Sequence, residues 1–439
     1  MKKTINIGMI GLGTVGMGVL KLIKKNRELI ERKACTKITL KRICDKNAAR
    51  FGAAAELGCG KGVFTARAQD IINDAGIDIV IELMGGYEPA LSYVLASIRK
   101  GKHVVTANKA MLARHWCEIF TEAEKNNALV YIEGSVCGGI PIIQSLNEGL
   151  AANRIKSVLG ILNGTTNYVL TRMLKDRMEF GRALDMAKRK GFAEADPGED
   201  VKGQDAANKL AVLASIIFGA CIKEKDIYRE GIENVKEEDI RYAFDEFGYV
   251  LKLLAVMKNN DGAVDLRVHP ALIKRDHPLS SVSDEYNAVY VTGDAVGRTM
   301  FFGRGAGEMP TASAVVSDVI YLSKNIHSGI AGKAPCFICD SRKKIKVLDI
   351  NDVKMRYYMR INSVDRPGVL SRISGILGEH NVSIDSVYQM GRGRPSGNVP
   401  IVLMTHFSKE GDVRKALSRI AGLSIVSKKS VLLRVEDDE

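Results

Sequence analysis

The chain has 439 residues, of which 46% are hydrophobic and 26% charged, and its formal net charge is +13. This composition is typical of a soluble globular protein, and the length suggests about three domains. The positive charge suits an anionic small molecule or a dinucleotide. It is spread along the chain without aromatic stacking platforms, so we do not expect nucleic acid as a partner.

The eight cysteines are scattered, and neither a secretory segment nor a membrane-length apolar run accompanies them. The longest largely apolar run, from Leu210 to Cys221, is too short to cross a membrane. We therefore predict a cytoplasmic protein with reduced thiols and no membrane partner. The motif Cys336-Phe337-Ile338-Cys339 has no second ligand pair for zinc and no thioredoxin-like context, so we interpret it as a hydrophobic linker or strand.

The amino-terminal stretch predicts a dinucleotide site. Residues 4–10 (TINIGMI) read as a buried strand, GLGTVG follows at 11–16, and a helical pattern continues to about residue 25. After a strand and at the start of a helix, this glycine pattern permits a tight turn and lets a pyrophosphate approach the helix amino terminus. Because glycines also make plain strand–helix turns, the prediction depends on this context.

The end of the second predicted strand, residues 37–44, leaves the choice between NAD and NADP open. Asp45 follows this strand and can bind the ribose hydroxyls of NAD. It comes later than is usual, because residues 26–36 read as an insertion. Lys46 and Arg50 could instead contact a 2′-phosphate.

The pattern that follows predicts an α/β fold and then two further regions. A doubly wound, mostly parallel sheet is expected, because strands alternate with helices and the strand at 77–83 is mostly apolar on both faces. The expected elements are strands at 77–83, 102–106 and 128–133, helices at 89–100 and 109–126, a strand–turn–helix at 157–173, helices at 182–190 and 204–220, and a strand-rich stretch at 264–300. The helix ending the Gly-rich stretch 301–324 is expected to return to the nucleotide domain.

The carboxyl-terminal part predicts a small βαββαβ unit of ferredoxin-like type after a charged linker at 335–354. Its expected elements are strands at 357–364, 383–390, 399–407 and 424–434, a helix within 365–384 and a helix at 411–421. The turn Asp365-Arg366-Pro367-Gly368 places proline at a helix entry and glycine where backbone must come close.

Two candidate sites lie in the first third of the chain. Asn108 and Lys109 come just past a strand end, where open α/β sheets bind ligands. The alternative is a helix-capping asparagine beside a solvated lysine. In EGSVCGGIPII (133–143), the carboxylate of Glu133 and turned backbone carbonyls could bind a hard monovalent cation, and the alternative is a glycine-rich hinge. The carbonyls are those of Val136, Gly138 and Ile140.

The pair Asp205 and Lys209 lies on a helix that is apolar nearly all round and is therefore predicted to be buried. Because lysine and aspartate are rarely buried unless they are paired, a polar pocket explains them better than a surface ion pair does. Upstream carboxylates at Glu194, Asp196, Glu199 and Asp200 suit the ammonium group of an amino acid, although some could form a plain acidic loop. The chemistry that fits is hydride transfer with lysine as acid and base.

Seven motifs occur in the order seen in homoserine dehydrogenase, and residues 1 to about 325 resemble that family. They are GLGTVG, ELMGG (82–86), VTANKA, GSVCGGIPII, GILNGTTNY, GFAEADPGEDVKGQDAANKL and GRGAG. Residues 356–434 resemble an ACT domain, an amino-acid-sensing module. The resemblance implies reversible NAD(P)-dependent interconversion of L-homoserine and L-aspartate 4-semialdehyde on the route to threonine, methionine and isoleucine. It also implies an amino-acid effector, namely threonine, and a homo-oligomer, a dimer or tetramer.

The resemblance also implies roles for individual residues. The cofactor residues would be Gly11, Gly13, Thr14, Val15, Gly16, Gly85, Lys109, Gly191 and Gly307, in addition to Asp45. The substrate residues would be Glu194, which binds the amino group, with Gly164, Thr165, Asp205 and Lys209. Lys209 would donate the proton to the aldehyde oxygen, and Lys109 would share that role or bind substrate. A sodium ion would be bound by Glu133, Val136, Gly138 and Ile140.

The predicted domains are an NAD(P)-binding Rossmann domain at 1–135, an α+β substrate-binding and dimerisation domain at 136–305, a return helix and linker at 306–354, and an ACT regulatory domain at 355–434. One position departs from the family pattern: Cys44 stands where many relatives place an arginine that contacts a 2′-phosphate. This weakens the case for NADP specificity.

Two other functions remain open at this point. One is another ACT-containing NAD-dependent dehydrogenase that acts on a hydroxyacid. It would need a His/Glu relay and an arginine for the carboxylate, and residues 191–210 contain neither signature. The other is an amino-acid sensor with an inactive Rossmann fold, which would have no use for Lys109, Glu194, Asp205 and Lys209.

Overall fold

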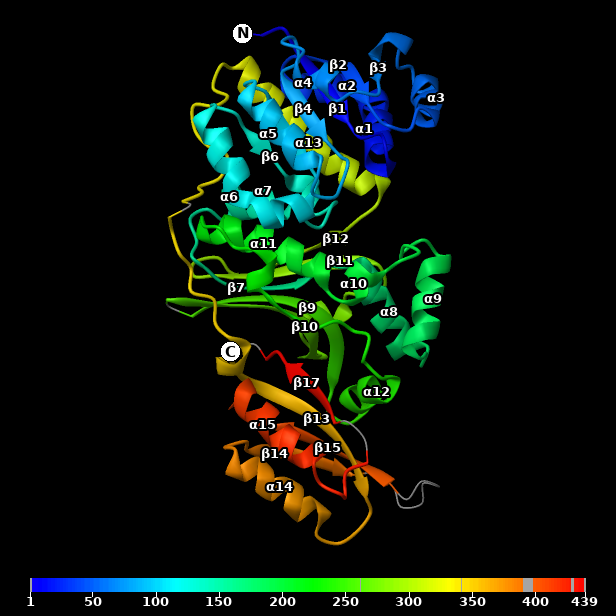
Figure 1. Ribbon diagram of the computed structural model, residues 1–439, viewed down its shortest axis with the longest axis vertical. Helices are drawn as coiled ribbons and strands as arrows, with labels where there is room; N and C mark the ends of the chain where they lie inside the picture. Colours follow the sequence, from blue (N-terminus) through cyan, green and yellow to red (C-terminus); the bar gives the residue numbers. More distant parts are fainter. Residues whose placement is uncertain (1, 261, 341, 390–397, 428–429, 438–439) are drawn as a thin grey trace. The chain divides into compact units, whose positions relative to one another are not determined.

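The computed structural model describes residues 2–260, 262–340, 342–389, 398–427 and 430–437 (Figure 1). The chain divides into two units. The first comprises Met1–Gly164, Gln204–Ile227 and Glu285–Ile345, and the second comprises Thr165–Gly203, Tyr228–Asp284 and Lys346–Glu439. No helix in the described ranges is long and apolar enough to cross a membrane.

The first unit is built on a six-stranded sheet with the order β3-β2-β1-β4-β5-β6. Its strand pairs are parallel, which confirms the predicted doubly wound α/β sheet. The strands are β1 Thr4–Ile10, β2 Lys37–Cys44, β3 Phe64–Thr65, β4 Ile79–Glu82, β5 His103–Thr106 and β6 Val130–Tyr131.

Helices cover both faces of this sheet, because successive strand residues point to opposite sides. Ile7 and Met9 of β1 pack in one core with helices α1, α2 and α13, whereas Ile10 packs in another with α4 and α5. The helices are α1 Thr14–Lys25, α2 Arg27–Ala34, α3 Ala49–Glu56, α4 Gln69–Ile72, α5 Ala90–Arg99 and α13 Glu308–His327. Helix α13 therefore returns to the nucleotide-binding core as predicted, and most of the predicted insertion at 26–36 is helix α2.

The rest of the first unit supplies the helices that carry the lysine pair. Helix α6 (Lys109–Lys125) begins just after β5, and α11 (Gln204–Phe218) packs against it. Between β6 and the next strand lie η2 Glu133–Ser135, α7 Ile142–Gln144 and η3 Ser145–Gly149. Strands β7 (Ile155–Ile161), β11 (Tyr286–Gly293) and β12 (Gly297–Arg304) form an antiparallel arrangement in the order β12-β11-β7, and η4 (Glu224–Asp226) follows α11.

The second unit contains α8 Gly164–Lys175, α9 Phe180–Arg189, α10 Gly198–Val201, β8 Tyr228–Arg229, α12 Glu237–Asp245, β9 Tyr249–Asn260, β10 Ala263–Lys274 and η5 Pro278–Ser281. Strands β9 and β10 form a long antiparallel hairpin, and β8 pairs with β10. Strand β9 was not expected from the sequence. Its first nine residues are all buried, and such a continuous apolar run cannot be distinguished from a buried helix by periodicity.

The carboxyl-terminal part of the second unit has the predicted βαββαβ order, with an antiparallel sheet β17-β13-β15-β14. Helices α14 and α15 share one apolar core with β13 and β15. The elements are η6 Ile350–Asp352, β13 Lys354–Val364, α14 Val369–Glu379, β14 Ile384–Gln389, β15 Asn398–Thr405, β16 Ser408–Lys409, α15 Glu410–Ala421 and β17 Val431–Val435. Residue 390 of the predicted second strand and residues 428–429 of the predicted fourth lie outside the described residues.

Strand β17 begins at Val431 rather than at residue 424, and it pairs with two strands. On one side it is antiparallel to β13, and on the other it is parallel to β10, where Ala271 faces Arg434. Ion pairs of two buried arginines cross the side that faces β10. Arg267 of β10 pairs with Glu436, and Arg434 Nη1 donates to Glu230, just after β8, at 2.7 Å. The ferredoxin-like sheet is therefore continuous with the β9–β10 hairpin (Figure 1).

Candidate active site

The glycine loop after β1 has the backbone that a pyrophosphate needs. Gly11 has a φ of +103°, and a Cβ there would lie 2.7 Å from the backbone of Leu83. A Cβ at Gly16 would lie 2.4 Å from the carbonyl oxygen of Gly11. A Cβ at Gly13 would meet only the tip of Arg50, at 4.0 Å, so the loop is tightly packed on one side and open at its second glycine.

Thr14 and Val15 begin α1, and the peptide N–H groups of a first helical turn have no partner within the helix. Two further predicted cofactor residues have backbone conformations that favour glycine. Gly85 has a φ of +74° with nothing within 4 Å of an added Cβ, and Gly307 has a φ of +123° directly before α13. The residues of the first unit therefore fit a dinucleotide.

Asp45 connects the second strand to the glycine loop. Its Oδ2 accepts a hydrogen bond from the backbone N–H of Leu12 at 2.7 Å and another from Arg50 at 3.1 Å, and its Oδ1 accepts from the N–H of Asn47 at 2.8 Å. Although burial alone raises the pKa of Asp45, these hydrogen bonds and the charge of Arg50 lower it overall. Asp45 is thus ionised, and Arg50 lies close to both the acidic residue and the open face of Gly13.

Asn108 is both the helix cap and a link to the second glycine turn. Its side-chain oxygen accepts from the N–H of Met111 at 3.2 Å, and its amide nitrogen donates to the carbonyl oxygen of Gly86 at 2.7 Å. Glu82, which is fully buried at the end of β4, accepts a hydrogen bond from Thr106 at 2.6 Å. Lys109 therefore begins α6 at the carboxyl edge of the parallel sheet, as the sequence predicts.

Asp205 and Lys209 are both buried, at 5% and 7% exposure, and form a direct ion pair. The Lys209 ammonium donates to Asp205 Oδ2 at 2.7 Å and to the carbonyl oxygen of Leu162 at 2.6 Å. Lys109 Nζ lies 3.1 Å from the other oxygen of Asp205. The structure thus brings both predicted lysines to one carboxylate, and Lys109 is the more exposed of the two, with 39% of its side chain accessible.

The charge state of this cluster follows from its composition. Burial by itself raises the pKa of Asp205, but the positive charges of Lys209 and Lys109 and its hydrogen bonds hold the pKa well below its usual range. Asp205 is therefore an anion near neutral pH. In the described part of the chain Lys209 uses two of its three N–H donors, which leaves one donor for a substrate oxygen.

Sequence reasoning did not identify two groups that complete the cluster. The side-chain amide of Asn163 donates to Asp205 Oδ2 at 2.8 Å, and the carbonyl of Leu162 accepts from Lys209. Asn163 is buried at 6% exposure. The signal available was the motif GILNGTTNY, which contains both residues but does not indicate which side chain faces the helix.

The other predicted substrate residues lie in the second unit, except Gly164, which ends a segment of the first. Thr165 Oγ1 donates to the carbonyl oxygen of Phe192 at 2.6 Å and lies 3.0 Å from Asp200 Oδ2, so the start of α8 is joined to the 191–200 loop. Glu194 is exposed, and Gly191 has a φ of +74° with open space around it. A Cβ at Gly164 would lie 2.6 Å from the Glu285 carbonyl oxygen.

Glu133 caps the short helix α7. Its two carboxylate oxygens accept from the N–H groups of Ile143 at 3.0 Å and Gln144 at 2.9 Å, and its own N–H donates to Asp318 at 2.9 Å. Burial raises the pKa of Glu133 to about 7 and that of Asp318 well above its usual range. The predicted cation residues Val136, Gly138 and Ile140 follow in the same buried turn.

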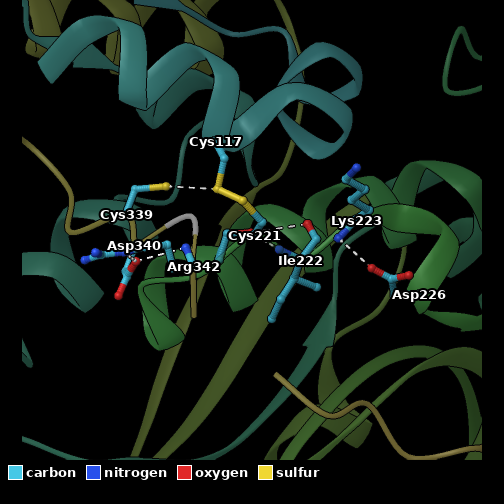
Figure 2. Close-up of a disulfide and its surroundings, with 9 residues drawn as sticks. Cys117, Cys221, Ile222, Lys223, Asp226, Cys339, Asp340 and Arg342 are labelled. Atoms are coloured by element: carbon cyan, nitrogen blue, oxygen red, sulfur yellow. Dashed lines mark hydrogen bonds and ion pairs between the residues drawn. A yellow bond between two sulfur atoms is a disulfide. The ribbon is translucent and has the colours of Figure 1, made fainter. Parts of the chain in front are cut away.

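The prediction of reduced, separate thiols is wrong for part of the chain. Cys117 and Cys221 are joined in a disulfide, and Cys339 of the C-x-x-C motif lies 3.1 Å from Cys117 (Figure 2). The C-x-x-C motif lies in irregular chain with a buried Phe337, as the linker interpretation predicts, but its Cys339 also lies beside the disulfide. Sequence spacing could not reveal the cluster, because α6, the end of α11 and the 335–340 segment meet only in the folded chain.

Three family models match the chain. A homoserine dehydrogenase model covers residues 141–320, a homoserine dehydrogenase NAD-binding domain model covers 11–133, and an ACT domain model covers 357–424. The chain is 44% identical over 440 residues to homoserine dehydrogenase from Synechocystis, with 98% of this chain and 99% of the relative covered. It is 38% identical to the Bacillus subtilis homoserine dehydrogenase, with 99% of each covered.

Comparison with solved structures indicates the same family as the sequence comparisons. A homoserine dehydrogenase from Thiobacillus denitrificans superposes with a TM-score of 0.93 at 40% identity and covers 99% of both chains. A hyperthermophilic archaeal homoserine dehydrogenase mutant in complex with NADPH has a TM-score of 0.61 at 25% identity and covers 72% of this chain and 97% of its own. The chain therefore belongs to the homoserine dehydrogenase family of NAD(P)-dependent oxidoreductases and has a carboxyl-terminal ACT domain.

Proposed function

We propose that this protein interconverts L-homoserine and L-aspartate 4-semialdehyde, with Lys209 as the residue that moves the proton. The observation behind this assignment is the buried cluster in which one carboxylate, Asp205, contacts two lysines at 2.7 and 3.1 Å. Such a cluster places mobile protons and positive charge where a dehydrogenase needs them.

Lys209 acts on the reacting oxygen. A nicotinamide cofactor held by the glycine loop would supply the hydride exchanged with the substrate carbon. As the aldehyde is reduced, negative charge grows on its oxygen, and the Lys209 ammonium stabilises that charge and delivers a proton. In the opposite direction Lys209 must be neutral to accept the hydroxyl proton. Asp205 holds Lys209 in place through the 2.7 Å contact and orients the substrate.

Lys109 and Glu194 bind the rest of the substrate in this proposal. Lys109 shares the carboxylate of Asp205 and is more exposed than Lys209, which suits a residue that binds substrate or assists the proton transfer. Glu194 is exposed, and we assign it to the ammonium group of homoserine, with Gly164 and Thr165 as further substrate residues.

The cofactor would bind along the carboxyl edge of the parallel sheet. We assign it to the glycine loop, Asp45, Gly85, Lys109, Gly191 and Gly307. The ionised Asp45 favours the ribose hydroxyls of NAD, and Arg50 beside it offers a positive charge to the 2′-phosphate of NADP. The residues at this position are therefore compatible with either cofactor. A sodium ion at Glu133, Val136, Gly138 and Ile140 would offset a buried carboxylate whose pKa burial has raised.

We also propose that the ACT domain regulates the enzyme in response to an amino acid, threonine being the first choice, in a homo-oligomer, a dimer or tetramer, in the cytoplasm. The proposed domains are 1–135, 136–305, 306–354 and 355–434. The pairing of β17 with β10 supports the regulatory role, because it connects the ACT sheet by hydrogen bonds to the β9–β10 hairpin.

The test is a steady-state assay of the full chain. Aspartate semialdehyde should be reduced with NADH or NADPH, and added threonine should lower the rate. Homoserine oxidation should rise with pH from about 7 to 10, because the lysine base must be neutral. Reduction of 2-oxo acids in preference to aspartate semialdehyde would contradict the substrate assignment, and a flat pH profile would contradict the lysine base.

A further inference from the structure

Three cysteine sulfurs from three separate segments meet in the first unit. Cys117 lies in α6, Cys221 follows the end of α11, and Cys339 lies in the segment after α13. Cys117 and Cys221 form a disulfide with a Cα–Cα distance of 5.7 Å, and the Cys339 thiol lies 3.1 Å from Cys117 Sγ. In the view of Figure 2, Cys339 and Cys221 lie on opposite sides of the Cys117 sulfur.

The position of Cys339 is determined by contacts on both sides of it in sequence. The ring of Phe337 packs against Trp116 and Phe120 of α6, with centroid distances of 5.7 and 5.3 Å. The N–H of Asp340 donates to the carbonyl oxygen of Gly219, just after α11, at 3.0 Å. The segment is therefore attached to α6 and to the end of α11, and these are the two segments that the disulfide joins.

We propose that this triad is a site of thiol–disulfide exchange, in which Cys339 is the third, exchanging thiol. The Cys339 thiolate attacks Cys117 Sγ, a new Cys117–Cys339 bond forms, the Cys117–Cys221 bond breaks, and Cys221 leaves as a thiolate that takes up the proton lost by Cys339. One disulfide and one thiol are present before and after, so the step needs no external oxidant or reductant.

The site is also open to small thiols and disulfides from solution. All three cysteines are half-buried rather than enclosed. A cleft of about 290 Å³ borders Cys117 and Cys221, and another of about 350 Å³ borders Cys339. Burial raises the pKa of both thiols of the C-x-x-C motif, that of Cys336 to about 12, so position distinguishes them: the Cys339 sulfur is the one that lies 3.1 Å from Cys117.

Exchange fits the triad better than a structural metal does. The sulfurs of Cys117, Cys221 and Cys339 form a group of only three potential ligands in the described ranges, whereas structural zinc takes four protein ligands. Exchange also has a structural consequence, because the Cys117–Cys221 bond links α6, which begins at Lys109, to the chain that follows α11, which contains Lys209. Moving the bond to Cys339 removes this covalent link between the two helices.

The exchange can be read by peptide mapping of the full chain, because each cysteine of the triad lies on a different tryptic peptide. These are residues 115–125, 210–223 and 334–342. The protein is purified without reductant, quenched in acid, alkylated with N-ethylmaleimide and digested without reduction. The wild type should give two linked species, 115–125 with 210–223 and 115–125 with 334–342, and partial alkylation of both Cys221 and Cys339.

Variants identify the exchanging thiol. Cys339→Ser should lose the second species and the alkylation of Cys221, whereas Cys336→Ser, on the same peptide, and Cys35→Ser, an exposed thiol outside the triad, should retain both species. Three results would overturn the proposal. They are a wild type that contains only the Cys117–Cys221 linkage, a second linkage that survives in Cys339→Ser, and a chain with all three thiols reduced that binds stoichiometric zinc.

Discussion

Lys209 of the first unit and Lys252 of the second are both buried lysines, but their partners differ. Lys209 is 7% exposed and contacts the carboxylate of Asp205 at 2.7 Å. Lys252 is 3% exposed and donates to the side-chain oxygen of Asn167 and to the carbonyl oxygen of Val282, both neutral groups. Burial, together with the charge of a nearby lysine, lowers the pKa of Lys252 to about 8.

The difference shows that a perturbed pKa and a position in the proposed site need not coincide. By its pKa alone, Lys252 would be a candidate general base, since its value lies near the operating range. Lys209 instead has a second lysine, an oriented carboxylate and a remaining donor around one position. Geometry therefore separates a lysine that can act on a substrate from one whose charge the fold merely tolerates.

Matched substitutions test this distinction most strongly. Lys209→Met should lower kcat by at least about 10²-fold in both directions, because general acid–base catalysis and the charge on the oxyanion are lost together. Lys252→Met keeps an unbranched side chain and removes the charge. It should leave kcat per folded molecule within about threefold of wild type, well below the effect of losing an acid or base. Equal losses of kcat in the two variants, measured by steady-state assays, would contradict the distinction between the two lysines.

The pH dependence of stability is the second test, and its sign follows from the lowered pKa of Lys252. Between pH 8 and 10.5 the unfolded chain retains a proton on Lys252 that the folded chain has released. The free energy of unfolding should therefore rise with pH in this interval, by up to about 3 kcal/mol from this group. The loss of stability caused by burying a charged Lys252 is fully present below pH 8 and is relieved as the pH approaches 10.5.

Urea unfolding of wild type and Lys252→Met at both ends of this interval measures the effect. The difference between the two proteins isolates Lys252, because all other titrating groups are shared. Curves that stay parallel across the interval would show that Lys252 is charged in the folded state.

The smallest expected effects come from the two asparagines that hold these groups. Asn163→Ala removes a 2.8 Å hydrogen bond to Asp205 and should lower kcat/KM about tenfold, because the carboxylate loses part of its orientation. Asn167→Ala removes an acceptor of Lys252 and should instead cost about 1–3 kcal/mol of unfolding free energy without changing kcat/KM. Steady-state kinetics and thermal unfolding of both variants measure these effects. The comparison of the two lysines would be contradicted if Asn163→Ala lowered only the stability and Asn167→Ala lowered only kcat/KM.

Much of the fold could be predicted because it depends on local patterns. Strand β1 and the start of α1 coincide with the predicted residues 4–10 and the GLGTVG motif, since a buried strand followed by a glycine turn is a contiguous signal. The βαββαβ order of the ACT domain can likewise be predicted, because strand-like and helix-like patterns of hydrophobic residues alternate along the chain. Strand β9 was missed because a run buried on both faces has no period to read.

The amino-acid sequence by itself determined that Asp205 and Lys209 share one face of a buried helix, because positions four residues apart on an apolar helix are neighbours whatever surrounds them. Only the tertiary structure decided that Lys109 and Asn163 reach the same carboxylate, that β17 pairs with β10, and that Cys339 meets the Cys117–Cys221 disulfide. These contacts join segments far apart in the chain. Their geometry comes from how helices and strands pack, which no local spacing records.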